Sequence, residues 1–279
     1  MSALKLDQLI RGVTVSAPEV YQKLTRALED PDSNYLDLGN IISADPGLSA
    51  RLLKLVNSPF YGFTSHVSSI THAIDIVGTS QLVDLALATE IVDKFNDIPR
   101  DLVDMRSFWK HSIGCGILAR GFAQKTGQLN PEKYYLAGLL HDIGSVLLYH
   151  QSPKMARLVL ETSRTNNQLL CDSEKELLGF DHGEIGRALF EKWFLPEVFA
   201  EVAESHHHPE RAVQHSFFVL IVHIADVICN EMGWGTGGEP QPPPLYKDAL
   251  VNAGINPADV ETIKKSCQSQ FNAVVNIFL

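Results

Sequence analysis

The sequence predicts an all-α protein, and two observations carry this prediction. Apolar residues recur at helical spacing through most of the 279 residues, as expected for amphipathic helices. Alternating apolar and polar runs with paired turn signals, which would indicate a β-sheet, are scarce. We therefore expect one helix after another, in a chain long enough for one large domain or two lobes that share a core.

Composition limits the classes of function. Hydrophobic residues make up 45% and charged residues 20%, as is usual for a soluble globular protein. The net charge of −10, from 23 basic and 33 acidic residues, disfavours binding to a nucleic-acid backbone, although a local metal could still attract a small anion. No apolar run reaches the ~18 residues of a membrane span, and the first residues do not resemble a signal peptide. The sequence therefore predicts no nucleic-acid partner and no membrane partner.

Cysteine usage predicts the compartment. The four cysteines lie far apart and form no C-x-x-C pair: Cys115, Cys171, Cys229 and Cys267. Two of them fall in apolar helical stretches, where a thiol usually acts as a small hydrophobic group. We expect reduced thiols and a cytoplasmic protein.

Residues 1–98 are predicted to form an N-terminal helical lobe. Pro18 indicates the start of a helix that continues to Leu28, and a second helix is expected over 36–43. Asp45-Pro46 is an N-cap followed by proline at the first helical position, and the helix that it starts ends at Asn57-Ser58-Pro59.

The remainder of this lobe contains an aromatic loop and two more helices. Residues 60–63 are predicted either to plug a gap between helices or, as a second interpretation, to form a lip that faces a ligand. A helix begins at Ser69 and ends at Gly78, and another is expected over 82–95. The short segment 96–99 predicts the boundary to the second part.

The second part, residues 99–230, carries unusual polar residues on inward helical faces. His111 shares one stripe with Cys115, Leu118 and Phe122. A lone histidine on such a stripe is more often a hydrogen-bonded core residue than a ligand. The interpretation therefore depends on the other histidines.

An apolar helix over 134–140 leads directly into His141-Asp142. His141 continues the buried face of this helix. An ionised Asp at such a place needs a partner, and a divalent metal is one candidate, although helix capping is another. We expect Gly144 to let the backbone turn sharply after this pair.

Three further histidines are predicted near inward faces. Asp181 and Glu184 indicate a capping box that places His182 in the first turn of a helix, where it could also simply be exposed. In the next helix the phase of the apolar residues predicts that His206 and His207 point inward and that His208 points outward.

The apolar helix over 217–229 contains Asp226, which needs a partner, and His223, which could support Asp226 or form an ordinary core hydrogen bond. Residues 231–279 are predicted to hold a Gly- and Pro-rich loop or linker, over 233–244, and a final helix over 259–278.

Several polar residues on separate helices, all phased toward one core, are better explained by one shared metal site than by independent core residues. These candidate metal ligands are His111, His141, Asp142, His182, His206, His207 and Asp226. An imidazole-rich set suits one or two divalent transition-metal ions, with Fe or Mn favoured and Zn, Co or Ni also suitable, better than Mg.

The order of these residues resembles the HD superfamily of metal-dependent phosphohydrolases and, more closely, the HDOD domain, an HD-related output domain of bacterial signalling. The resemblance covers about residues 5–230 and rests on spaced motifs: Asp45-Pro46, Asn57-Ser58, Ser69-Ile70, residues 137–144, residues 179–182, Trp193 with Leu195-Pro196, and His206-His207. It implies an N-terminal helical lobe packed on an HD-type helical core.

The resemblance also implies roles. His111, His141, Asp142 and Asp226 match the ligands of a first metal, and Asp142 matches the carboxylate that bridges to a second. His182, His206 and His207 match the additional histidines of two-metal members.

Ser145 stands where the HD-GYP branch usually carries a lysine, and no Gly-Tyr-Pro motif follows His207. We therefore do not expect cyclic-di-GMP hydrolysis.

Two functions follow as hypotheses. The first is a signalling module that keeps the metal site as structure or as a ligand anchor, with a signalling protein as partner. The second is a metal-dependent phosphohydrolase in which Asp142 is the catalytic carboxylate and the substrate is a phosphorylated small molecule or nucleotide.

Overall fold

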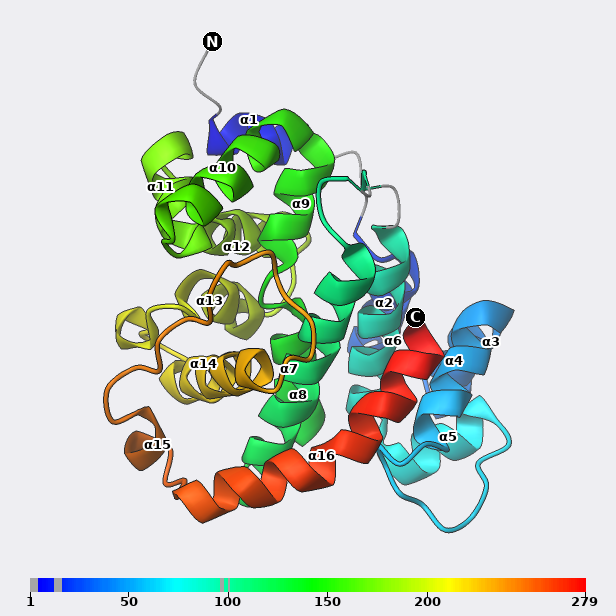
Figure 1. Ribbon diagram of the computed structural model, residues 1–279. Helices are drawn as coiled ribbons and strands as arrows, with labels where there is room; N and C mark the ends of the chain where they lie inside the picture. The colour runs from blue at the N-terminus through cyan, green and yellow to red at the C-terminus, as the bar shows by residue number, and fades with distance from the viewer. Residues whose placement is uncertain (1–4, 13–16, 96–97, 100) are drawn as a thin grey trace. The chain divides into compact units, whose positions relative to one another are not determined.

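A computed structural model describes residues 5–12, 17–95, 98–99 and 101–279, and within these ranges it contains helices and loops but no β-strand (Figure 1). The all-α prediction is therefore confirmed. None of the described helices is both long and apolar enough to cross a bilayer.

The helices have the following bounds: α1 Leu6–Arg11, α2 Glu19–Glu29, α3 Tyr35–Ser43, α4 Pro46–Val56, α5 Ile70–Val77, α6 Thr79–Lys94, α7 Met105–Lys125, α8 Pro131–Leu140, α9 Ile143–Gln151, α10 Pro153–Asn166, α11 Leu170–Leu178, α12 His182–Lys192, α13 Glu197–Ser205, the 3₁₀ turn η1 Pro209–Arg211, α14 Ser216–Glu231, α15 Ala249–Asn252 and α16 Pro257–Phe278.

The chain divides into two compact units. One comprises Met1–Val15 and Phe95–Ile263, and the other comprises Ser16–Lys94 and Lys264–Leu279. Residues 96–97 of the expected boundary segment lie outside the described residues, and the predicted division at 98 and 230 stays a prediction.

Local capping signals set the helix ends of the second unit. The Asn34 side chain caps α3 in a capping box with Asp37, Asp45 caps α4 by accepting a hydrogen bond from Leu48 N at 2.9 Å, and Ser69 caps α5. Gly78 ends α5 with a φ of 97°, which glycine adopts at no steric cost. Helix α6 starts at Thr79, three residues earlier than expected.

The aromatic loop divides its residues between two roles. Phe60 is 2% exposed and packs in the core, as the plug interpretation predicted. The rings of Tyr61 and Phe63 stack with centroids 5.3 Å apart, and Phe63 is 37% exposed.

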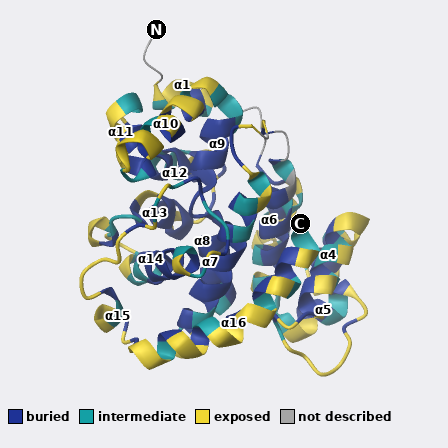
Figure 2. Cartoon of the chain, in the orientation of Figure 1, coloured by how far each residue is buried: buried dark blue, intermediate teal, exposed yellow. Residues whose placement is uncertain are grey.

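The first unit is a helical core built around two groups of three helices. Helix α7 packs against α8 and α14, while α12 packs against α9 and α13. Most residues of α7, α8 and α14 are buried (Figure 2), so polar side chains on these helices must find partners inside the protein. The four cysteines are free and buried.

Gly144 has a different role from the one predicted. It does not adopt a positive φ and lies in the first turn of α9. A Cβ atom at this position would lie 1.9 Å from the carbonyl oxygen of His182 and 2.7 Å from Gly186 N. Glycine is therefore required because the backbones of α9 and α12 touch here, and this contact places Asp142 beside His182.

We predict that Gly144→Ala separates α9 from α12 and destabilises the protein by several kcal/mol, because the overlap is with backbone that cannot rotate away. Thermal unfolding measures the effect. Gly47→Ala is a suitable control, since Gly47 is exposed in the first turn of α4 and alanine favours helix. Equal stability of the two variants would contradict the assignment.

Candidate metal centre

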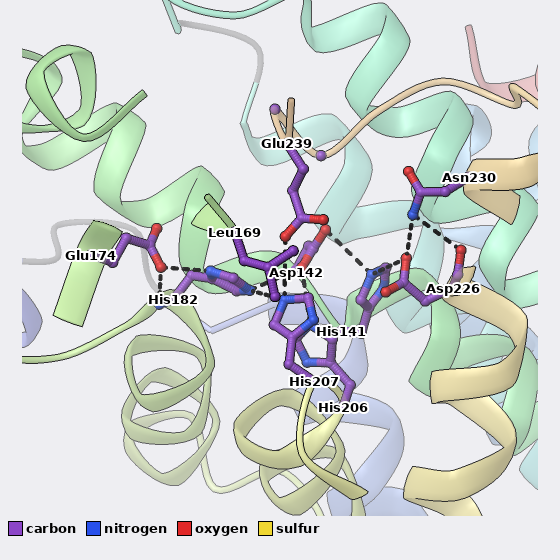
Figure 3. Close-up of polar contacts among 12 residues, drawn as sticks. His141, Asp142, Leu169, Glu174, His182, His206, His207, Asp226, Asn230 and Glu239 are labelled. Atoms are coloured by element: carbon purple, nitrogen blue, oxygen red, sulfur yellow. Dashed lines mark hydrogen bonds and ion pairs between the residues drawn. The ribbon is translucent and has the colours of Figure 1, made fainter. Parts of the chain in front are cut away.

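The seven residues predicted as ligands converge within the first unit. Their candidate ligand atoms form two groups, each with all its atoms within 4.8 Å of one another: Asp142, His182, His206 and His207 in one, and His111, His141 and Asp226 in the other. Six of the seven are buried, and the His207 side chain is only 9% exposed. The structure therefore brings together residues from helices far apart in sequence (Figure 3).

Asp142 joins the two groups through its two carboxylate oxygens. Oδ1 lies 3.4 Å from the Nε2 atoms of both His182 and His206. Oδ2 lies 3.2 Å from His141 Nε2 and 3.9 Å from His111 Nε2. One oxygen thus faces each group, which is the arrangement of a carboxylate that could bridge two ions.

Backbone carbonyls fix the tautomers of two histidines. His141 Nδ1 donates to Gly138 O at 2.7 Å, and His206 Nδ1 donates to Ala203 O at 2.8 Å. In the neutral form each ring therefore presents an Nε2 lone pair, and both buried Nε2 atoms lack a hydrogen-bond partner. Neutral imidazole nitrogens held by a carbonyl on the far side are typical metal ligands.

The carboxylate of Glu174 holds His182, and no sequence pattern indicated this contact. The predicted capping box of Asp181 and Glu184 is present, so His182 begins α12, but its side chain is 1% exposed rather than on the surface. Its Nδ1 lies 2.6 Å from Glu174 Oε2, which also accepts from the backbone N–H of His182 at 2.8 Å. Carboxylate–histidine pairs of this kind orient ligands in metal sites.

The second group contains an Asp–His pair. His111 Nε2 lies 3.0 Å from Asp226 Oδ1, and Asn230 Nδ2 donates to the same oxygen at 2.9 Å. Burial opposes ionisation of Asp226, but His111 and its neighbours outweigh it and hold the pKa of this carboxyl below its usual range. The carboxylate is therefore ionised and available to a cation.

In the group formed by Asp142, His182, His206 and His207, burial and charge shift the pKa values of Asp142 and His207. Burial again opposes ionisation of Asp142, but the surrounding histidines hold its pKa well below the usual range. Burial and the neighbouring histidines His206 and His182 depress the pKa of His207 well below its ordinary value. His207 is therefore neutral, as a ligand must be.

A third carboxylate, Glu239, reaches the site from the loop between α14 and α15. Its Oε1 lies 3.5 Å from His207 Nε2, and its side chain is 9% exposed. Burial together with the charges of Asp226 and Asp142 raises its pKa to about 8. The sequence indicated only a Gly- and Pro-rich loop here, because a single Glu in such a segment carries no periodic signal.

The structure also shows the roles of His223 and His208, which are not among the candidate ligands. His223 is a core residue: its Nδ1 donates to His206 O at 2.8 Å, and its Nε2 accepts from Tyr246 N at 2.8 Å. The His208 side chain is 38% exposed and pairs with Glu210. His223 thus has the second of its two predicted roles, and His208 points outward as predicted.

The donor set fits a divalent transition metal. Five imidazoles and two carboxylates surround one buried space, two Nε2 lone pairs have no hydrogen-bond partner, and Glu239 feels the uncompensated charge of the other two carboxylates. A cation between these groups would satisfy the lone pairs and remove the repulsion. Nitrogen-rich ligation of this kind suits Fe, Mn, Zn, Co or Ni better than Mg.

Comparison with known proteins identifies the family. The HDOD domain matches residues 15–209, so the chain belongs to the HDOD domain family, and the resemblance inferred from the sequence is confirmed. An uncharacterised protein of Treponema pallidum (strain Nichols) is 27% identical over 261 residues, which are 92% of this chain and 49% of that protein. The chain thus spans about half the length of this curated relative.

Two solved structures share the fold. An HDOD domain protein of unknown function from Geobacter sulfurreducens is 27% identical with a TM-score of 0.77, over 98% of this chain and 95% of that one. A protein of Shewanella amazonensis SB2B, provisionally named a phosphohydrolase, is 23% identical with a TM-score of 0.78, over 100% of this chain and 99% of that one. At the latter identity the likeness concerns the fold alone.

We predict that Glu174→Gln lowers metal affinity about 10- to 100-fold, because the charged acceptor that orients His182 is lost. Competition with a chromophoric chelator measures the affinity. Glu176→Gln on the exposed face of the same helix is the matched control and should bind like the unaltered protein. An unchanged affinity in Glu174→Gln would contradict the role of Glu174.

Metal uptake should release protons. Burial lowers the pKa of His141 and His182, but Asp142 and Glu174 outweigh it and raise both pKa values well above the ordinary value. A protonated imidazole cannot bind metal, so affinity is expected to fall as the pH drops below these raised pKa values. Calorimetry in buffers of different ionisation enthalpy counts the protons, and a count of zero near neutral pH would contradict this expectation.

Proposed function

We propose that this chain is a metal-binding HDOD module that serves as an output domain in signalling. The observation that carries the proposal is the position of Asp142, with one oxygen toward each group of buried histidines. In this proposal Asp142 would hold two divalent transition-metal ions, one through each carboxylate oxygen. His182, His206 and His207 would hold one ion, while His111, His141 and Asp226 would hold the other.

The small size of the site favours a module over an enzyme. The ligands are packed so closely that no space for even a water molecule is left among them, and the walls of the site also include Gly237 and Glu239. Pockets for small molecules usually measure about 300–1,000 Å³. The metal centre would therefore act mainly as an anchor that ties α7, α8, α12, α13 and α14 together, while a signalling protein binds elsewhere on the chain.

The complete ligand set supports a second candidate, a metal-dependent phosphohydrolase acting on a phosphorylated small molecule or nucleotide. Bound metal would supply a water of near-neutral pKa and a site for a phosphate oxygen. Asp142 would then orient the ions, and the carbonyls of Gly138 and Ala203 would keep His141 and His206 in the required tautomer. Ser145 supplies no cationic contact for a second phosphate, which disfavours cyclic dinucleotides as substrates.

Metal content tests the proposal. Protein purified without a polyhistidine tag should contain about two transition-metal ions per chain, and Asp142→Asn should lose both, because it removes the bridging charge at nearly unchanged size. Asp172→Asn, at an exposed position of α11, should retain them. Full metal retention in Asp142→Asn would refute the site.

A screen with phosphomonoesters and phosphodiesters in the presence of Mn²⁺ distinguishes the two candidates. Metal without turnover supports the module. Turnover that is lost in Asp142→Asn and kept in Asp172→Asn supports the hydrolase.

A further inference from the structure

The loop over residues 233–244 is a built part of the metal centre rather than a linker. Trp234 is 6% exposed, Thr236 N donates to Ser107 O at 3.4 Å, and the Tyr149 hydroxyl donates to Gly237 O at 3.0 Å. Beyond the loop, Tyr246 N donates to His223, which in turn donates to the carbonyl of His206. Both ends of the loop are thus tied to elements that carry candidate ligands.

Close approach explains the glycine at the centre of this loop. A Cβ atom at Gly237 would lie 2.7 Å from Asp142 Oδ2, so only glycine lets the backbone pass directly over the bridging carboxylate. Gly237 also lines the remaining space of the site, together with Asn230 and Glu239. The loop therefore closes the side of the centre that the helices leave uncovered.

Glu239 points from this loop toward His207 and Asp142 (Figure 3). Its side chain is more than nine-tenths buried, and its Oε1 has no hydrogen-bond partner. A buried carboxylate oxygen without a hydrogen-bond partner costs about 1–3 kcal/mol or more. A cation shared with the neighbouring ligands would remove this cost.

We propose that Glu239 is an eighth ligand of the metal centre and occupies the position that an oxyanion such as phosphate would otherwise take. This inference rests on the proposed metal site. A carboxylate and a phosphate offer the same chemistry to a metal, a negatively charged oxygen. The loop thus acts as an internal substitute ligand, and a phosphate-bearing ligand binds only when Glu239 withdraws.

A cavity beside the end of the loop shows how a bound molecule could move Glu239 away from the metal centre. Residues 243–246, at the end of the loop and just beyond it, line a neighbouring cavity of about 210 Å³, whose wall also includes His207 and His208. A ligand or partner segment that fills this cavity would displace residues next to Glu239. Displacement there would expose the metal centre to anions.

Cobalt spectroscopy of the full chain tests the proposal, because the visible bands of Co²⁺ report its ligands directly. Glu239→Ala should change the Co²⁺ spectrum in the absence of any anion. Titration with inorganic phosphate should then change it further, with an apparent Kd at least tenfold lower than for the unaltered protein. Glu176→Ala, which removes an exposed carboxylate of α11 away from the loop, should match the unaltered protein in both respects.

Tyr149→Phe provides a second, independent variant. It keeps Glu239 but removes the hydroxyl that holds Gly237, so it should bind phosphate more tightly than the unaltered protein and less tightly than Glu239→Ala. If Glu239→Ala does not fold, the phosphate affinity of Tyr149→Phe alone tests whether the loop competes with phosphate: an affinity equal to that of the unaltered protein would refute the proposal.

The experiment distinguishes failure of the proposed metal site from failure of the proposed role of Glu239. If the unaltered protein binds no Co²⁺, the proposed metal site is wrong and this inference falls with it. If Co²⁺ binds and the spectra and phosphate responses of Glu239→Ala and the unaltered protein coincide, only the role of Glu239 is refuted.

Discussion

The buried carboxylate of Asp142 is the constraint on which the first unit depends. It lies between the end of α8 and the start of α9, where an apolar helix would ordinarily exclude a charge. Four histidine Nε2 atoms lie within 4 Å of its two oxygens. The Nδ1 atoms of His141 and His206 donate to the carbonyl oxygens of Gly138 and Ala203, so the Nε2 atoms of these two rings point toward Asp142. Two buried Nε2 atoms, those of His141 and His206, have no hydrogen-bond partner beside this carboxylate, and a cation there would satisfy both.

Close backbone contacts bring these side chains to one place. A Cβ atom at Gly138 would lie 2.8 Å from Gly116 Cα, and one at Gly116 would lie 2.6 Å from Tyr135 O, so α7 and α8 pack with their backbones nearly touching. Gly144 does the same for α9 against α12. His111 and His141 therefore come close together although thirty residues separate them. Their ring centroids are 5.3 Å apart.

Much of the fold and most of the candidate ligands were predictable because they depend on local signals. Caps at Asp45, Ser69 and Asp181 and the phase of apolar residues are properties of single helices. The phase placed His206 and His207 inward and His208 outward, as the structure has them. The resemblance to the HDOD family indicated which residues of separate helices belong to one set of ligands, and this information is not present in any single helix.

The remaining features depend on contacts between segments, and the sequence could not show them. Glu174 meets His182 only because α11 folds back on α12. Glu239 lies in a segment without periodicity, and its importance follows from the passage of Gly237 over Asp142. The prediction for Gly144 failed for the same reason: glycine permits both a turn and a close approach, and only the position of α12 decides between them.

Anomalous X-ray diffraction from crystals grown with Mn²⁺ tests the central claim most directly. We predict two manganese peaks on opposite sides of the Asp142 carboxylate, one beside His182, His206 and His207 and the other beside His111, His141 and Asp226. A map without a peak at Asp142, or with manganese bound only elsewhere on the chain, would contradict the account.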